Sequence, residues 1–161
     1  MNAFVVGIGA SGFDAEVRVI DALRALRNTA FIDVRAQSRS FQNPAVGGAT
    51  LAPFVNAAVV VETALAATPL LRTLHALEAR AGRMRFIKNG PRTLDLDLLW
   101  QLDAPAPSSE PLLPHPRLLS RPFAVIPAIE ALEQAGRAVP FALRAAARSL
   151  DRGCLQPTRS R

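Results

Sequence analysis

Two aspartates, Asp95 and Asp97, have a spacing that could place two carboxylates side by side. They alternate with Leu94, Leu96 and Leu98 in a stretch that opens on a Gly-Pro turn. Successive side chains of a β-strand point to opposite faces, so we expect the leucines to face a core and the aspartates to lie about 7 Å apart on the other face. Neighbouring carboxylates repel each other unless a cation lies beside them, and hard oxygen ligands suit Mg²⁺ bound to substrate phosphates. The spacing favours a site for Mg²⁺ and a polyphosphate, although two ordinary acids on a solvent-facing strand fit it equally well.

Basic and polar residues around this stretch could complete such a site. Residues 82–92 hold four cations, among them Arg92, and form either a solvated basic loop or a lid that closes on phosphate. His115 lies between two prolines that restrict its backbone, which favours a role as a ligand. Asn56 is a polar residue in the mostly apolar run 54–62. It is either a core amide whose hydrogen bonds are satisfied or a residue that recognises the edge of a base, because its amide both donates and accepts hydrogen bonds.

Composition limits the class of protein. The chain has 161 residues, of which 50% are hydrophobic and 20% charged, which predicts one globular domain over 1–161 with a flexible tail at 152–161. The net charge of +6 suits a nucleotide substrate, and the lack of a nucleic-acid motif argues against a nucleic-acid partner. Cys154 is the only cysteine, the N-terminus lacks a secretory pattern, and no apolar run is long enough for a spanning helix. We therefore expect a cytoplasmic protein without a membrane partner.

Apolar periodicity predicts an alternation of strands and helices. Besides the aspartate stretch, strands are expected at 3–8, 31–39 and 54–62. Helices are expected after Asp14, from Thr68 as N-cap with Pro69 at N1, over 122–134 with a kink at Pro127, and over 140–150. Long loops are expected at 42–53 and 103–116.

The same periodicity assigns helix faces. The first helix should bury Val19, Ala22, Leu23 and Leu26. The second should bury Leu70, Leu74, Leu77 and Ala81, with His75 and Glu78 as a solvated pair on another face. The third should direct Phe123, Ile126 and Ile129 toward the core.

Several motifs together resemble one enzyme family. The stretch Gly-Pro-Arg-Thr-Leu-Asp-Leu-Asp-Leu-Leu from Gly90, followed by Pro-His-Pro-Arg at 114–117 and Arg-Pro-Phe at 121–123, resembles 6-hydroxymethyl-7,8-dihydropterin pyrophosphokinase of folate biosynthesis. Phe-Val-Asn at 54–56 and the spacing of Glu78, Gly82, Arg83 and Arg85 extend the resemblance over most of residues 38–130. It implies an α+β ferredoxin-like sandwich, an antiparallel sheet with helices packed on it. It also implies a monomer that transfers pyrophosphate from ATP to the pterin hydroxymethyl oxygen, with Mg²⁺ and with release of AMP.

The resemblance assigns roles by position. It implies that Asp95 and Asp97 hold two Mg²⁺ ions and that Arg83 and Arg92 act with them in catalysis. The implied ATP site comprises Glu78, Arg85, Arg92, Leu98, His115 and Arg121. The implied pterin site comprises Pro44, Val46, Gly47, Phe54, Asn56, Asp95 and Phe123.

The chain also departs from the family pattern. The turn Gly-Ala-Ser-Gly at 9–12 replaces the usual Gly-Ser-Asn, and the basic loop is one residue shorter. Asn43 replaces a common threonine, Asn89 stands where an aromatic residue often covers the pterin, and Glu110 and Leu112 stand where polar residues can contact ATP. These differences leave open a divergent paralogue acting on another pterin, or a non-catalytic protein that binds ATP or pterin.

Overall fold

A computed structural model describes residues 1–43, 53–82, 94–104, 110–150 and 155–158. The elements are, in chain order, β1 (Asn2–Ser11), α1 (Ala15–Arg27), β2 (Ile32–Gln37), β3 (Phe41–Asn43), β4 (Phe54–Thr63), α2 (Ala67–Arg80), β5 (Asp95–Leu102), a short 3₁₀ helix (Leu118–Ser120), α3 (Pro122–Gln134), α4 (Phe141–Ser149) and β6 (Gln156–Pro157).

The strands form one antiparallel sheet with β1 near its middle. Within the described residues the order is β5-β1-β4-β3-β6, and β2 pairs with another part of β4. The pairs of β1 with β4 and with β5 place Gly9 between Asn56 and Asp95, and Gly7 between Ala58 and Asp97. One short stretch of β1 therefore joins the two strands that carry the candidate site residues.

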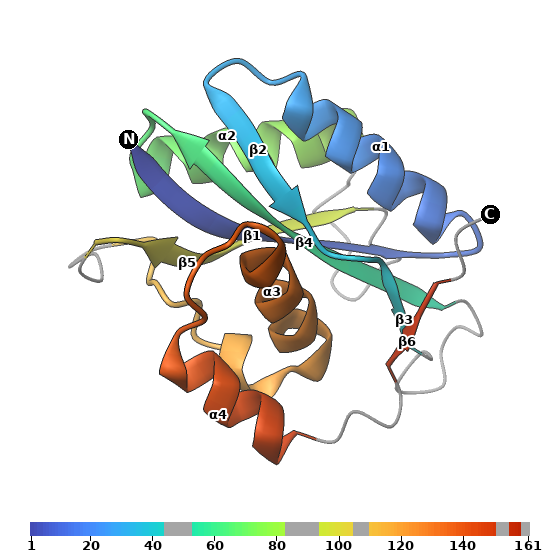
Figure 1. Ribbon diagram of the computed structural model, residues 1–161. Helices are drawn as coiled ribbons and strands as arrows, with labels where there is room; N and C mark the ends of the chain where they lie inside the picture. The colour runs from blue at the N-terminus through green and yellow to red at the C-terminus, as the bar shows by residue number, and fades with distance from the viewer. Residues whose placement is uncertain (44–52, 83–93, 105–109, 151–154, 159–161) are drawn as a thin grey trace.

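Helices cover both faces of the sheet (Figure 1). α1 and α2 pack on one face, where Phe4, Val6 and Ile8 of β1 are buried against them. α3 and α4 cover the other face, where Val5 and Val60 join a second core. Alternate residues of the same central strands thus face two different cores, as the pleat requires. The predicted α+β sandwich with an antiparallel sheet is confirmed.

The third helix forms where the sequence predicts it, with a core face that differs in part from the predicted one. α3 begins with Pro122 at N1, where the missing N–H costs nothing. Its buried residues are Val125, Pro127, Ala128, Ala131 and Leu132. Ile126 and Ile129 are partly buried and pack against the second core, as predicted, whereas Phe123 does not belong to it. The fully buried face centres on the small residues Ala128 and Ala131, which a hydrophobic pattern ranks below isoleucine and phenylalanine.

The second helix differs from its prediction at both ends. It begins at Ala67 after Ala66 as N-cap, two residues earlier than expected. The Thr68 hydroxyl donates instead to the carbonyl of Glu110 at 3.0 Å. Toward its C-terminus Ala81 is exposed and Glu78 is buried. The predicted solvated pair of His75 and Glu78 is therefore wrong at Glu78.

The end of the chain contributes to the sheet. Gln156–Pro157, expected to belong to a flexible tail, forms β6 and pairs with Phe41 and Gln42 of β3. Residues 42 and 43 of the predicted loop 42–53 belong to β3, and residues 44–52 lie outside the described residues. Among the helices that the structure describes, none has the length and apolarity needed to cross a membrane.

Candidate active site

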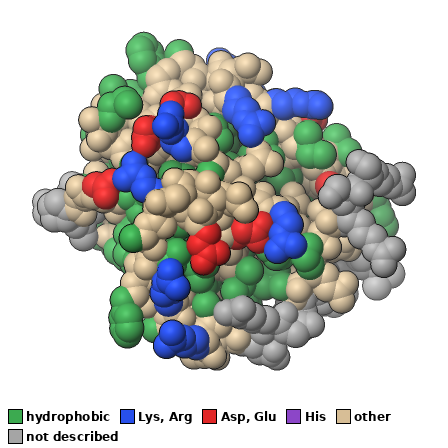
Figure 2. Space-filling model, in the orientation of Figure 1, with side chains coloured by type: hydrophobic (Ala, Val, Ile, Leu, Met, Phe, Trp, Pro, Cys, Tyr) green, Lys and Arg blue, Asp and Glu red, His purple; other side chains and the backbone are tan. Residues whose placement is uncertain are grey.

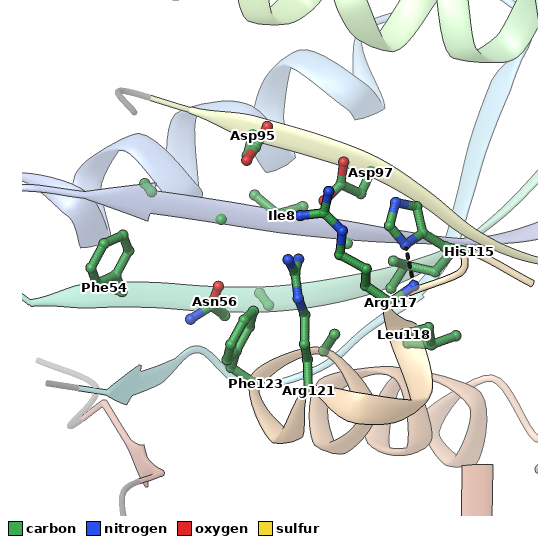
Figure 3. Close-up of a pocket in the computed structure, with 16 residues that line it drawn as sticks. Ile8, Phe54, Asn56, Asp95, Asp97, His115, Arg117, Leu118, Arg121 and Phe123 are labelled. Carbon is green, nitrogen blue, oxygen red and sulfur yellow. Dashed lines mark hydrogen bonds between the residues drawn. The ribbon is translucent and has the colours of Figure 1, made fainter. Parts of the chain in front are cut away.

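A cavity lies on the α3 face of the sheet, beyond the N-terminal end of α3 (Figure 3). Its walls come from β5, β1 and β4, and from the segment that leads through the 3₁₀ helix into α3. Figure 3 shows Asp95 and Asp97 on β5 at one side, and Phe54 and Asn56 on β4 at the other. The sequence-predicted site residues that the cavity brings together are Phe54, Asn56, Asp95, Asp97, His115, Arg121 and Phe123.

Two glycines of β1 form the floor between these sides. Gly7 and Gly9 point toward the α3 face, and both line the cavity. A Cβ on Gly9 would lie 3.2 Å from Oδ1 of Asn56, and a Cβ on Gly7 would lie 3.0 Å from Cδ1 of Leu99. Any side chain at these positions would take space from the cavity, so the glycines keep the floor open to a ligand.

The carboxylate side has the electrostatics of a cation site. Asp95 and Asp97 share one face of β5, with Leu94, Leu96 and Leu98 buried on the other, as the alternation predicts. Burial raises the pKa of Asp97, and the neighbouring charge of Asp95 raises it further. A cation between the two carboxylates would relieve both effects.

The segment before α3 supplies cationic and imidazole groups. The backbone N–H of His115 donates to the carbonyl of Leu99 at 2.8 Å, which fixes this residue beside β5. Nδ1 of His115 accepts from the N–H of Arg117 at 3.2 Å, so a neutral ring carries its proton on Nε2. The guanidinium of Arg117 extends toward Asp97, and that of Arg121 lies between the two sides of the cavity (Figure 3).

The opposite side suits a flat polar ring. Asn56 Nδ2 donates to Asn43 Oδ1 at 2.7 Å, which orients the amide. Phe54 and Phe123 lie near it in Figure 3, and the Arg121 guanidinium carbon is 5.6 Å from the centre of the Phe123 ring. Aromatic faces with an oriented amide are a usual means of binding a heteroaromatic ring. Phe123, which helical periodicity directed toward the core and the family resemblance assigned to the pterin site, lines the cavity.

Two of the predicted ATP-site residues lie away from this cavity. Leu98 is 3% exposed and packs in the core under α1 and α2, on the far side of the sheet. Glu78 is 1% exposed, and its Oε1 accepts from the N–H of Leu96 at 2.8 Å. Other predicted residues lie outside the described residues, and their roles remain predictions: Pro44, Val46, Gly47, Arg83, Arg85 and Arg92.

The cavity also includes residues that sequence reasoning did not assign to the site. Leu99 lines it, whereas Leu98 does not, because Leu99 follows Asp95 and Asp97 on the same face of β5; the strand alternation could have indicated it. Arg117 belongs to the Pro-His-Pro-Arg motif and precedes Arg121 by four residues, a spacing that could have indicated it. No local signal distinguished Gly7 and Gly9 from ordinary strand residues.

The arrangement defines a class of protein. Paired carboxylates, arginines and a histidine can bind a polyphosphate, and an oriented amide between aromatic rings can bind a flat acceptor beside it. Both are reached from one cavity over a glycine floor. This is the organisation of an enzyme that transfers a phosphoryl or pyrophosphoryl group.

Comparison with known proteins identifies the family. Residues 5–133 match the model of the 7,8-dihydro-6-hydroxymethylpterin-pyrophosphokinase family, and the chain belongs to this family. It is 34% identical to a 2-amino-4-hydroxy-6-hydroxymethyldihydropteridine pyrophosphokinase of Synechocystis over 78% of this chain and 64% of that protein. It is 31% identical to the enzyme so named from Bacillus subtilis, over 83% of this chain and 80% of the relative.

Solved structures share the fold. An HPPK-DHPS in complex with substrates superposes with a TM-score of 0.65 and 10% identity, over 92% of this chain and 43% of that one. HPPK-DHPS of Plasmodium falciparum gives a TM-score of 0.61 with 11% identity, over the same 92% and 43%. At these identities the likeness concerns the fold alone, which is the predicted ferredoxin-like sandwich.

Proposed function

We propose that the cavity transfers a pyrophosphoryl group from ATP to the hydroxymethyl oxygen of 6-hydroxymethyl-7,8-dihydropterin in folate biosynthesis, with release of AMP. The observation that carries the proposal is the presence, over one glycine floor, of a carboxylate pair and an oriented amide between two phenylalanines. Family membership supports the same reaction. The hydroxymethyl oxygen forms a bond to the β-phosphorus of ATP, and the bond from that phosphorus to the α,β-bridging oxygen breaks.

Asp95 and Asp97 would hold Mg²⁺ in this reaction, and we expect two ions. The residues present fit such ions, because the carboxylates are adjacent, half-buried and mutually repulsive. The described residues contain no cluster of three or more acidic, histidine or cysteine ligands, so phosphate and water oxygens would have to supply the other ligands of such ions. When bound, Mg²⁺ neutralises charge that develops on the phosphates.

The remaining side chains bind and orient the two substrates. Asn56 hydrogen-bonds the polar edge of the pterin, while Phe54 and Phe123 hold its faces. Arg121 and His115 bind the polyphosphate. Because Nδ1 of His115 already accepts from the N–H of Arg117, the Nε2–H of a neutral ring is the group that can donate to a phosphate oxygen. Arg83, Arg85 and Arg92 are proposed to add phosphate contacts. We further propose that the enzyme is a cytoplasmic monomer.

The test measures AMP release from ATP and Mg²⁺ with and without the dihydropterin, followed by mass spectrometry of the pterin product. The proposal requires AMP release that depends on the pterin, together with a diphosphorylated pterin. A matched control is 6-methyl-7,8-dihydropterin, which lacks the acceptor oxygen and must give no AMP.

Other results would contradict the proposal in distinct ways. ATP and pterin binding without turnover would indicate a non-catalytic binding protein. Turnover only with another hydroxylated pterin would indicate a divergent paralogue.

A further inference from the structure

A buried carboxylate lies behind the strand that carries the two aspartates. Glu78 of α2 is 1% exposed and follows Leu70 and Leu74, both 0% exposed, at intervals of four along the helix. It therefore lies on the buried stripe of α2, on the face of the sheet opposite the cavity. Burying a carboxylate is costly unless hydrogen bonds compensate it, so the contacts of Glu78 indicate why it is there.

Glu78 contacts the backbone between the two aspartates. Its Oε1 accepts from the N–H of Leu96 at 2.8 Å. In an antiparallel ladder, residues alternate between pointing their backbone groups at the partner strand and away from it. Since the N–H of Leu96 points to Glu78, the flanking Asp95 and Asp97 are the residues whose backbone faces β1.

This position makes the bond a means of holding the aspartates. Among the described residues β5 pairs only with β1, so its outer edge has no neighbouring strand there. Without Glu78, the N–H of Leu96 would lose its acceptor beside a side chain that is 1% exposed. Strand β5 would then be free to shift at the residue from which both carboxylates project.

We propose that Glu78 is a positioning residue for the metal site: its hydrogen bond to Leu96 fixes the spacing and direction of Asp95 and Asp97. The inference rests on the proposed role of these two aspartates as cation ligands. It replaces the expected contact of Glu78 with ATP by an action through the backbone of β5. The property that this role requires is the reach of the acceptor oxygen to the N–H of Leu96.

Two conservative variants separate the effect of the position of the acceptor oxygen from the effect of the carboxylate charge. Glu78→Gln keeps an acceptor oxygen at the same distance and loses the charge. Glu78→Asp keeps the charge and is one methylene shorter, which withdraws the acceptor from Leu96. Arg72→Gln, an exposed position on the same helix, is the matched control.

The first measurement is the binding of Mn²⁺, followed by electron paramagnetic resonance, in the presence of α,β-methylene-ATP, whose bridging carbon prevents transfer. Outer partners of metal ligands are typically worth about 10- to 100-fold in affinity. We expect Glu78→Asp to weaken Mn²⁺ binding by about tenfold, with Glu78→Gln within about threefold of wild type. Hydrogen exchange of the Leu96 amide, measured by NMR, should be faster in Glu78→Asp and unchanged in Glu78→Gln.

Turnover gives a second readout that simple destabilisation would not reproduce. Glu78→Asp should lower kcat and raise the Mg²⁺ concentration needed for half-maximal rate, while KM for the pterin stays unchanged. Mn²⁺ binding that is unchanged in Glu78→Asp, or weakened only in Glu78→Gln, would overturn the inference. If the wild type binds Mn²⁺ but transfers no pyrophosphate, the proposed function fails, and the comparison of Mn²⁺ affinities still decides the role of Glu78.

Discussion

Asp97 shows at the scale of one residue how a binding site works against stability. Burial, and then the charge of Asp95, raise the pKa of Asp97 above its ordinary value. The folded protein therefore holds a proton at Asp97 over a pH range in which the unfolded chain has released it. Stability is lost as the pH rises through that range, because the native state then binds more protons than the unfolded state.

Replacing Asp97 with asparagine should therefore raise the melting temperature while it abolishes turnover. At neutral pH the variant avoids the cost of a half-buried carboxylate beside Asp95, and it loses a proposed Mg²⁺ ligand. Thermal unfolding at pH 7 and at pH 3 provides the measurement: the gain in Tm should be present at pH 7 and shrink at pH 3, where both states of wild-type Asp97 are protonated. An active variant, or one with a lower Tm at pH 7, would count against this account.

Asn43 should act on pterin binding through Asn56. Replacing Asn43 with alanine removes the acceptor 2.7 Å from Asn56 Nδ2 and leaves the amide free to turn. A hydrogen bond of this kind contributes about 1 kcal/mol, so KM for the pterin should rise about fivefold with kcat nearly unchanged. Steady-state kinetics test this, with exposed Gln42→Ala on the same strand as control. If Asn43→Ala raised the KM for ATP instead, the assignment of Asn43 to the pterin side would be contradicted.

At the scale of elements, β1 shapes the site chiefly because it has no side chains at Gly7 and Gly9. Its even-numbered residues Phe4, Val6 and Ile8 fill the core under α1 and α2. On the other face, Gly7 and Gly9 lie between the strands that carry the functional side chains. The same pleat thus provides a packed core on one side and an open floor on the other.

A methyl group on Gly9 should block the pterin side of this floor. The new Cβ in Gly9→Ala would lie 3.2 Å from Oδ1 of Asn56, so the amide must move from its place over the floor. We expect KM for the pterin to rise at least tenfold, with unfolding by heat little changed. Gly7→Ala is the comparison: its Cβ would meet the end of the flexible Leu99 side chain, away from Asn56, and its effect on the pterin KM should be smaller. Equal effects of the two variants would disprove the assignment of the pterin to the Asn56 side.

The elements also show which parts of the site the sequence could predict. The alternation of leucine and aspartate in β5 predicted both faces correctly, because one face of an antiparallel strand is buried and the other is not. Glu78 was misplaced because periodicity scores a glutamate as polar, whereas its burial depends on a backbone N–H that a distant strand supplies.

Other features depended on tertiary structure in the same way. Phe123 lines the cavity because of the orientation of α3, which helical periodicity did not predict, although the family resemblance assigned Phe123 to the pterin site. The glycine floor became visible only when the strand order brought β4 and β5 to either side of β1.

At the scale of the whole molecule, the surface agrees with a small-molecule substrate. Arg side chains are interspersed with Asp and Glu over the described part of the face in Figure 2, despite the net charge of +6. Several arginines of the described residues are neutralised locally, as in the pair of Arg39 with Glu130 at 3.0 Å. A continuous basic surface for nucleic acid is not seen on that part of the face.

The C-terminal strand should influence the pterin side at a distance. Removing residues 155–161 deletes β6, which pairs with β3 at Phe41 and Gln42, directly before Asn43. We expect a higher KM for the pterin and a Tm lower by a few degrees, since a loss of about 1 kcal/mol corresponds to about 2–4 °C in a chain of this size. Removing only residues 159–161 keeps β6 and is the control. A truncation that changes the Mg²⁺ requirement and not the pterin KM would contradict this coupling.

The central place of β1 has a consequence for how the chain folds during synthesis. β1 leaves the ribosome first, yet its partners β4 and β5 follow much later, so its contacts have a high contact order and form slowly. β4 emerges well before β5, which allows β1 and β4 to pair while the edge that β5 will occupy is still open. Phe54 and Asn56 of β4 can therefore take their places beside β1 on a nascent chain that has not yet received its two aspartates or Phe123. In the proposed function, pyrophosphate transfer therefore requires that β5 has docked against β1.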